Sequence, residues 1–171
     1  KLYTGTGAEL AITGVGFQPD FTWIKTRTLT YNHRAMDSVR AETYYEVTPN
    51  SNAAQTTADA QTLKSFDSDG FTLGTSSGVN PVSTMASWNW KAGGAPTADN
   101  DNTGGAMDAN SVALNGSLQA AYTPSGSPSV YPKRMSINTT NGFSIISYTS
   151  PGSSSDETIP HGLSQRPDMV I

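Results

Sequence analysis

The chain has 171 residues, enough for one ordinary domain with its own core or for two very small ones. Hydrophobic residues make up only 35% and charged residues 14%, so small neutral residues (Ser, Thr, Asn and Gly) carry an unusual share. The net charge is −4 and the few Lys and Arg are scattered, apart from Lys133-Arg134, which argues against a nucleic acid as partner.

Further classes are excluded by what the sequence lacks. Without Cys there is no disulfide framework, no thiolate metal site and no Cys nucleophile. No apolar run approaches the ~20 residues of a membrane-spanning helix, so we expect no membrane insertion. Three Trp, seven Tyr and five Phe spread along the chain favour a folded domain over a disordered one.

Strands separated by turns are the predicted elements. In chain order they cover residues 21–25, 43–47, 63–66, 71–73, 85–90 and 143–148, with a weaker strand or hairpin near 112–118. Asp67-Ser68-Asp69-Gly70 predicts a hairpin turn between two of them. Helix-forming patterns are poor, and only residues 52–64 allow a short helical turn. The predicted fold class is therefore all-β, an antiparallel β-sandwich of jelly-roll type with long polar loops.

Tryptophan placement is the main prediction about the core. Residues 85–90 alternate so that Ala86, Trp88 and Trp90 share one face, and we expect that face to carry both indoles into the core. Core packing is favoured over a sugar-stacking platform for Trp23 too. A glycan platform is expected instead at Tyr122, Tyr131 or other loop residues, where exposure is usual.

Domain organisation follows from an internal repeat. Tyr3-Thr4, a Gly turn and Pro19-Asp20 before an apolar strand recur as Tyr148-Thr149, His161-Gly162-Leu163 and Pro167-Asp168 before Met169-Val170-Ile171. We expect one β-rich module over residues 1–147 and the start of a second, truncated copy over 148–171. Residues 92–131, rich in Gly, Pro and Ser, form a loop-rich excursion or a linker. Because the chain begins at Lys1 and stops inside an apolar run, we expect a fragment or a processed product.

Six motifs follow one another along the chain. They are Tyr3-Thr4-Gly5-x-Gly7, Gly16-x-x-Pro19-Asp20-Phe21-x-Trp23-Ile24-Lys25, His33-Arg34 with Asp37-Ser38-Val39-Arg40, residues 66–74, Trp88-x-Trp90-Lys91-Ala92-Gly93-Gly94, and Asn141-Gly142-Phe143-Ser144-Ile145. Their order resembles a family of repeat-containing bacteriophage structural proteins of marine phages and cyanophages. The first Gly turn departs from it, with Thr13-Gly14-Val15 where the second has His161-Gly162-Leu163. The resemblance implies a virion component and supplies no catalytic residues.

Candidate metal sites are weak. Residues 99–104 resemble the first half of a calcium loop, with Asp99 and Asp101 at alternate positions, but Asn110 stands where a bidentate Glu is required. A solvated Asx loop is therefore favoured over a bound cation. Asp67 and Asp69 are likewise interpreted as turn residues. The two histidines, His33 and His161, lack metal-ligand spacing.

Catalytic groupings are no stronger. His33 and Asp37 suggest a hydrolytic triad only with an arbitrary Ser, and no Gly-x-Ser-x-Gly motif exists. The acids Asp37, Glu42 and Glu46, with the Asp67 and Asp69 pair, offer carboxylates for glycoside hydrolysis, but nothing isolates two of them. We therefore predict no catalytic, cofactor-binding or metal-ligating residues and no enzymatic activity.

The predicted function is that of a structural module of a virion, part of a tail fibre or similar appendage. It is expected to assemble with copies of itself, as trimers by analogy with fibres, and with other virion proteins. Contact with a host-surface glycan, as in a lectin-like receptor-binding module, is the first alternative. A capsid decoration protein is the second, and a polysaccharide depolymerase is a less favoured third.

Overall fold

The computed structural model describes residues 1–40, 61–152 and 155–171, and these residues form eleven β-strands. The chain divides into two compact units, residues 1–91 and residues 92–171, each with its own core. The described residues contain no helix, so none is long and apolar enough to cross a bilayer.

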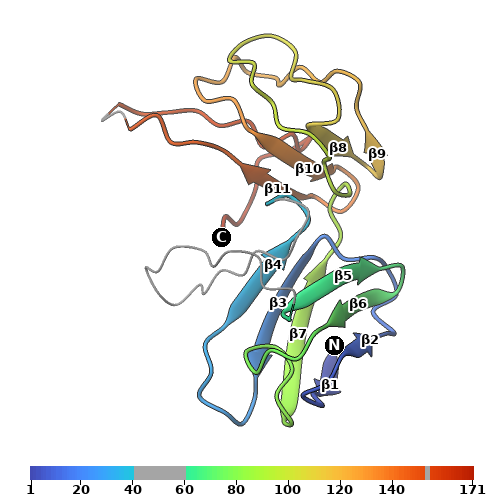
Figure 1. Ribbon diagram of the computed structural model, residues 1–171. Coiled ribbons are helices and arrows are strands. Elements are labelled where there is room, and N and C mark those ends of the chain that lie inside the picture. The colour runs from blue at the N-terminus through green and yellow to red at the C-terminus, as the bar shows by residue number, and fades with distance from the viewer. Residues whose placement is uncertain (41–60, 153–154) are drawn as a thin grey trace. The chain divides into compact units, whose positions relative to one another are not determined.

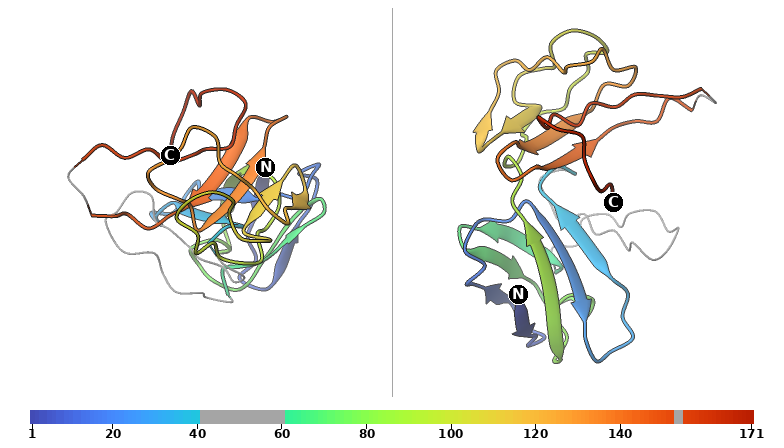
Figure 2. Two further views of the ribbon diagram at one scale, coloured as in Figure 1. Left: turned by 90° about the horizontal axis from the view of Figure 1, so that it is seen from above. Right: turned by 180° about the vertical axis from the view of Figure 1, so that it is seen from behind.

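The first unit consists of two sheets (Figure 1). Its strands are β1 (Leu2–Thr4), β2 (Leu10–Ile12), β3 (Phe21–Thr26), β4 (Arg34–Asp37), β5 (Leu63–Asp67), β6 (Gly70–Leu73) and β7 (Thr84–Trp90). One sheet has the order β1-β7-β3-β4 and the other β2-β6-β5, and every pairing in both is antiparallel. Seen from behind, the four-stranded sheet lies in front of the three-stranded one (Figure 2, right).

The core of the first unit lies between these sheets. Buried side chains from both form one cluster: Ile12, Ile24, Met36, Leu63, Phe71, Leu73, Val79 and Met85. Tyr3 packs against it with its ring edge toward Phe71 and donates its hydroxyl to the carbonyl of Val79 over 2.7 Å. Since aliphatic residues are few, one layer between two sheets is the arrangement that buries most of them.

Loops of the first unit meet at Asn80, which is fully buried. Its Oδ1 accepts from the backbone N–H of Thr6 at 2.8 Å, and its Nδ2 donates to the carbonyls of Ala8 and Gly74. One side-chain amide thereby provides hydrogen-bond partners for backbone groups of two segments that are far apart in sequence. Without it, water would have to reach these buried groups.

The second unit is built on one sheet of four strands, in the order β11-β10-β8-β9. These are β8 (Val112–Leu114), β9 (Ser117–Leu118), β10 (Arg134–Asn138) and β11 (Phe143–Ser147). Strands β8 and β9 are joined by Asn115-Gly116, both with positive φ, the geometry of a tight two-residue hairpin. Strands β8 and β10 are parallel, so the chain must cross over between them.

A small cluster forms the core of the second unit. Met107, Val112, Met135 and Ile137 are buried in it, and Tyr122, Tyr131 and Leu163 from the loops pack against it. Gly93 passes so close to the parallel pair that a Cβ there would lie 2.2 Å from the Ala113 carbonyl oxygen. The loops of residues 92–131 are therefore part of this core-forming unit.

The predicted all-β, sandwich-like fold is confirmed, and so are most of its strands. The hairpin across Asp67-Ser68-Asp69-Gly70 joins β5 to β6, and the hairpin near residues 112–118 joins β8 to β9. The predicted strand at 43–47 and most of the possible helical turn at 52–64 lie outside the described residues. The repeat with a second copy from residue 148 stays a prediction.

Replacing Asn80 by Ala tests the polar contact that joins the loops of the first unit. The variant leaves the Thr6 N–H and two carbonyls without their buried partner, and we expect it to lower the free energy of unfolding by about 2–4 kcal/mol. Urea denaturation measures the change. Gln18→Ala, which removes an exposed amide with one 3.2 Å bond, is the control, with an expected change within about 0.5 kcal/mol. Equal effects of the two substitutions would contradict the structure.

Candidate functional site

The outer face of the four-stranded sheet is the most distinctive surface of the first unit, and the register of β3 and β7 defines it. Trp23 lies opposite Trp88, and Ile24 lies opposite Ser87. Ile24 and Ser87 are buried on the inner side of the sheet. Because side chains alternate along a strand, the residues next to Ile24 in β3 and next to Ser87 in β7 point to the outer side. We call that side, carrying Phe21, Trp23, Lys25, Ala86, Trp88 and Trp90, the aromatic face.

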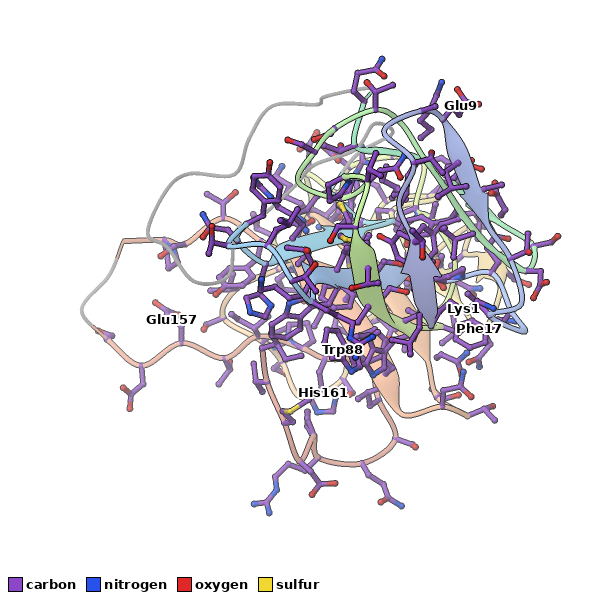
Figure 3. All side chains as sticks on the ribbon, turned by 90° about the horizontal axis from the view of Figure 1, so that it is seen from below. Lys1, Glu9, Phe17, Trp88, Glu157 and His161 are labelled. Atoms are coloured by element: carbon purple, nitrogen blue, oxygen red, sulfur yellow. The ribbon has the colours of Figure 1, made fainter. Side chains whose placement is uncertain are left out.

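Trp88 is the exposed residue of the aromatic face, with half of its surface (50%) open to solvent. It lies toward the end of β7, a central strand held by β1 on one side and β3 on the other (Figure 3). Its neighbours on the same strand face are the small Ala86 before it and Trp90 after it, so space is open on the Ala86 side. A rigid strand therefore presents an open indole ring.

Its aromatic neighbours are held in place. The Trp23 indole N–H donates to Nδ1 of His33 at 2.9 Å, and the two rings meet edge to face. Phe21 and Trp90 lie opposite each other with ring centroids 5.4 Å apart. Both Trp23 and Trp90 are half-buried. These contacts fix one side of the aromatic face around Trp88.

The prediction that Trp88 and Trp90 lie in the core is wrong, because the opposite alternation of β7 faces inward. Met85 is fully buried and Ser87 is 3% exposed, while Trp88 is half-exposed. Thr22 and Asn89 meet on the inner side through a 3.1 Å hydrogen bond between their side chains. Polar residues on the inner side are thus accommodated by hydrogen bonding, and the larger rings are left outside.

Charged side chains on the aromatic face are already engaged. The Lys25 ammonium donates to the carbonyls of Thr26 and Leu29. The Asp37 carboxylate accepts from the Arg40 guanidinium at 2.5 Å and from the backbone N–H groups of Val39 and Arg40. The Asp37 charge is thus paired with Arg40, while Lys25 keeps its positive charge and is held in place by the two carbonyls.

The suggested triad is not assembled from His33 and Asp37. His33 Nδ1 accepts from Trp23, and Asp37 is bonded to Arg40 and to the backbone that follows it. Each side chain therefore holds local structure in the first unit. Glu42 and Glu46 lie outside the described residues.

Tyr122 and Tyr131, predicted as an exposed glycan platform, are half-buried and pack against the core of the second unit. The Tyr131 hydroxyl accepts from the backbone N–H of Gly105 at 3.0 Å. Burial raises the pKa of Tyr122 above its ordinary value. The predicted exposure is therefore wrong for both residues. Their rings fill part of the core, because this unit has few aliphatic side chains to do so.

The loop that resembles a calcium site is closed by its own hydrogen bonds. Buried Asn100 accepts from the N–H groups of Asn102 and Asp108 and donates to the Pro132 carbonyl. Asp101 binds the Lys133 ammonium at 2.6 Å, and this hydrogen bond raises the pKa of Lys133. Asp99, the other candidate cation ligand of this loop, binds the Arg134 guanidinium at 2.5 Å. A solvated Asx loop accounts for these contacts.

Asp69 and Asp67 have structural partners as well. The Asp69 carboxylate accepts from the N–H groups of Gly14 and Gly16, at 2.8 and 2.6 Å, and these bonds lower its pKa. The Asp67 carboxylate accepts from two neighbouring hydroxyls, at 2.7 Å each. The first contact ties the glycine turn before β3 to the β5–β6 hairpin.

His161 also belongs to a turn, and its Nδ1 accepts from the N–H of Leu163 at 3.0 Å. Gly162 between them has φ of +73°, close to the +75° of Gly14 in the first unit. Across the described stretches of the chain, no three His, Asp or Glu side chains gather in a way that would hold a metal ion.

Trp88→Phe tests the exposure of the aromatic face. We expect acrylamide to quench tryptophan fluorescence less in this variant, because the two remaining indoles are half-buried. Unfolding free energy should change by less than about 1 kcal/mol, as for other surface substitutions. Trp23→Phe, which removes a half-buried indole, is the control and should keep the strong quenching. An unchanged quenching constant in Trp88→Phe would contradict the orientation of β7.

Asp69→Asn tests the link between the glycine turn and the hairpin. The folded-state pKa of Asp69 lies below its unfolded value of about 3.9, so the charged carboxylate stabilises the fold above that pH. The stabilisation is lost as the pH falls through the folded-state pKa. We expect the variant to be less stable than the wild type at pH 7 and the difference to shrink below about pH 4. Thermal unfolding across pH measures it, with Glu9→Gln, which breaks an exposed ion pair, as control. A constant difference would contradict this role.

Comparison with known proteins yields a family and no described activity. No curated protein and no solved structure matches the chain. A family model described as "Domain of unknown function (DUF7483)" matches residues 1–128 and residues 112–171, two overlapping stretches that together span both units. The chain therefore belongs to the DUF7483 family of domains of unknown function.

Proposed function

We propose that this protein is a non-enzymatic structural module of a bacteriophage virion, part of a tail fibre or similar appendage that contacts the host surface. The order of sequence motifs along the chain is the support for a virion component. We further propose that it assembles with copies of itself, as a trimer by analogy with fibres, and with other virion proteins. Nucleic-acid binding and membrane insertion form no part of this proposal.

The observation that carries a surface-contacting role is the half-exposed Trp88 on the rigid aromatic face. Tryptophan is enriched at the centres of binding surfaces, where it buries a large and rigid ring. The acids considered for catalysis are bonded instead to a guanidinium, to hydroxyls or to backbone N–H groups, as Asp37, Asp67 and Asp69 illustrate. Binding therefore fits the described residues better than hydrolysis.

A lectin-like receptor-binding module is the second candidate, and the same exposed indole favours it. In a receptor-binding module the aromatic face would bind the host surface, whereas in a purely architectural module it would bind another protein of the particle. A capsid decoration protein is separated from an appendage module by its position on the particle. We do not propose a depolymerase.

Immunolabelling of purified particles tests the proposal. Fab fragments raised against the recombinant chain should bind a tail appendage at regular positions in electron micrographs of the phage that encodes it. A Fab directed at the major capsid protein of the same phage serves as control for labelling of the shell. Label on the capsid lattice would replace an appendage by a decoration protein. Label on no part of the particle, with the antigen present in the lysate, would refute a virion role.

A further inference from the structure

We propose that the aromatic face binds a neutral glycan by stacking a sugar ring on Trp88. This inference deepens the proposed function, on which it rests, by naming the site and the chemical class of ligand. It transfers the expected glycan contact from the tyrosines of the second unit to the four-stranded sheet of the first.

The indole of Trp88 is free to stack. Among the described residues it takes part in no ring–ring contact, and no described group accepts a hydrogen bond from its N–H. A sugar ring has an apolar face of C–H groups with hydroxyls around its rim. The open indole matches both parts, since its ring offers the apolar surface and its N–H a donor at the edge.

The surroundings hold the platform still. Trp23 lies directly opposite Trp88 across the strand pair and is anchored through its N–H to His33. On the side of Ala86 the strand leaves space beside the ring, so a flat ligand meets a bulky side chain of β7 only at Trp90. Preorganised aromatic groups lose little entropy on binding, which suits recognition of a weakly hydrophobic ligand such as a sugar.

Charge selects a neutral ligand. Lys25 contributes a single positive charge to the aromatic face, with its ammonium held by two backbone carbonyls, and Asp37 is paired with Arg40. An anionic polysaccharide or a nucleic acid needs several clustered cations on the binding surface, which a single lysine does not provide, and the chain as a whole carries a net charge of −4. An uncharged polyhydroxylated polymer needs no such groups.

The size of the exposed surface favours a sugar over a second copy of the chain. The exposed large apolar residues among the described strands of this sheet are Trp88 and Leu2, which lies opposite Ala86. Half of a tryptophan surface is on the order of 100 Å². Stable protein interfaces bury about 800 Å² on each partner, several times what these two side chains offer. A single pyranose ring covers one indole.

The test is affinity electrophoresis of the full chain through gels that contain neutral glucan, galactan or mannan, each beside its sulfated form. At least one neutral polymer should retard the wild type. Trp88→Ala should weaken the apparent affinity by about tenfold or more, the loss that truncating a central interface tryptophan commonly causes. Tyr148→Ala removes an equally exposed aromatic side chain from the second unit and should bind like the wild type.

Three results would overturn the proposal: no retardation by any neutral polymer, equal retardation of the wild type and Trp88→Ala, or retention by the sulfated forms alone. Circular dichroism and thermal unfolding establish that Trp88→Ala is folded, and Trp88→Phe, which keeps a ring, should retain part of the binding. Light scattering completes the test, because a lower oligomer mass for Trp88→Ala would assign the face to contacts between copies. Fab labelling of the virion without any glycan binding would refute this inference and leave the proposed function standing.

Discussion

Strands β3 and β7 pair along the whole of β3, and their register decides which side chains of the first unit lie in its core and which lie at its surface. With Ile24 opposite Ser87, the Ile24 side chain packs in the core cluster that contains Phe71 and Met85. A shift by one residue would turn Trp23 inward and Ile24 outward. The burial of Ile24 therefore depends on the same constraint that exposes Trp88.

Polar groups carry much of the structural work in both units, because aliphatic side chains are scarce. Asn80 in the first unit and Asn100 in the second are each buried and each bonded to backbone groups from several segments. Such contacts are directional, so they hold loops in one arrangement where an apolar contact would allow several. They also make each position intolerant of replacement, since an unpaired buried amide or carbonyl is costly.

Fold class and most strands could be predicted from the sequence, because turn-forming residues separate short β-branched and aromatic runs. The orientation of β7 could not be predicted from β7 alone, since either alternation carries apolar residues. Lys25 indicates which face is outside, because it shares a strand face with Trp23 and lysine side chains are rarely buried. Combining it with the pairing of β3 and β7 would have placed Trp88 outside. The pairing itself joins residues too far apart for local patterns to reveal.

The central position of β7 also has a consequence for how the first unit forms. As the last strand of that unit in the chain, it lies between β1 and β3, which come much earlier. During synthesis on the ribosome, both wait with unpaired edges until residue 90 has emerged. Non-local pairing of this kind slows folding, commonly to milliseconds or longer, and leaves strand edges open to other chains meanwhile. The hazard grows with the concentration of the chain, so rapid closure of the sheet by β7 would limit pairing between copies.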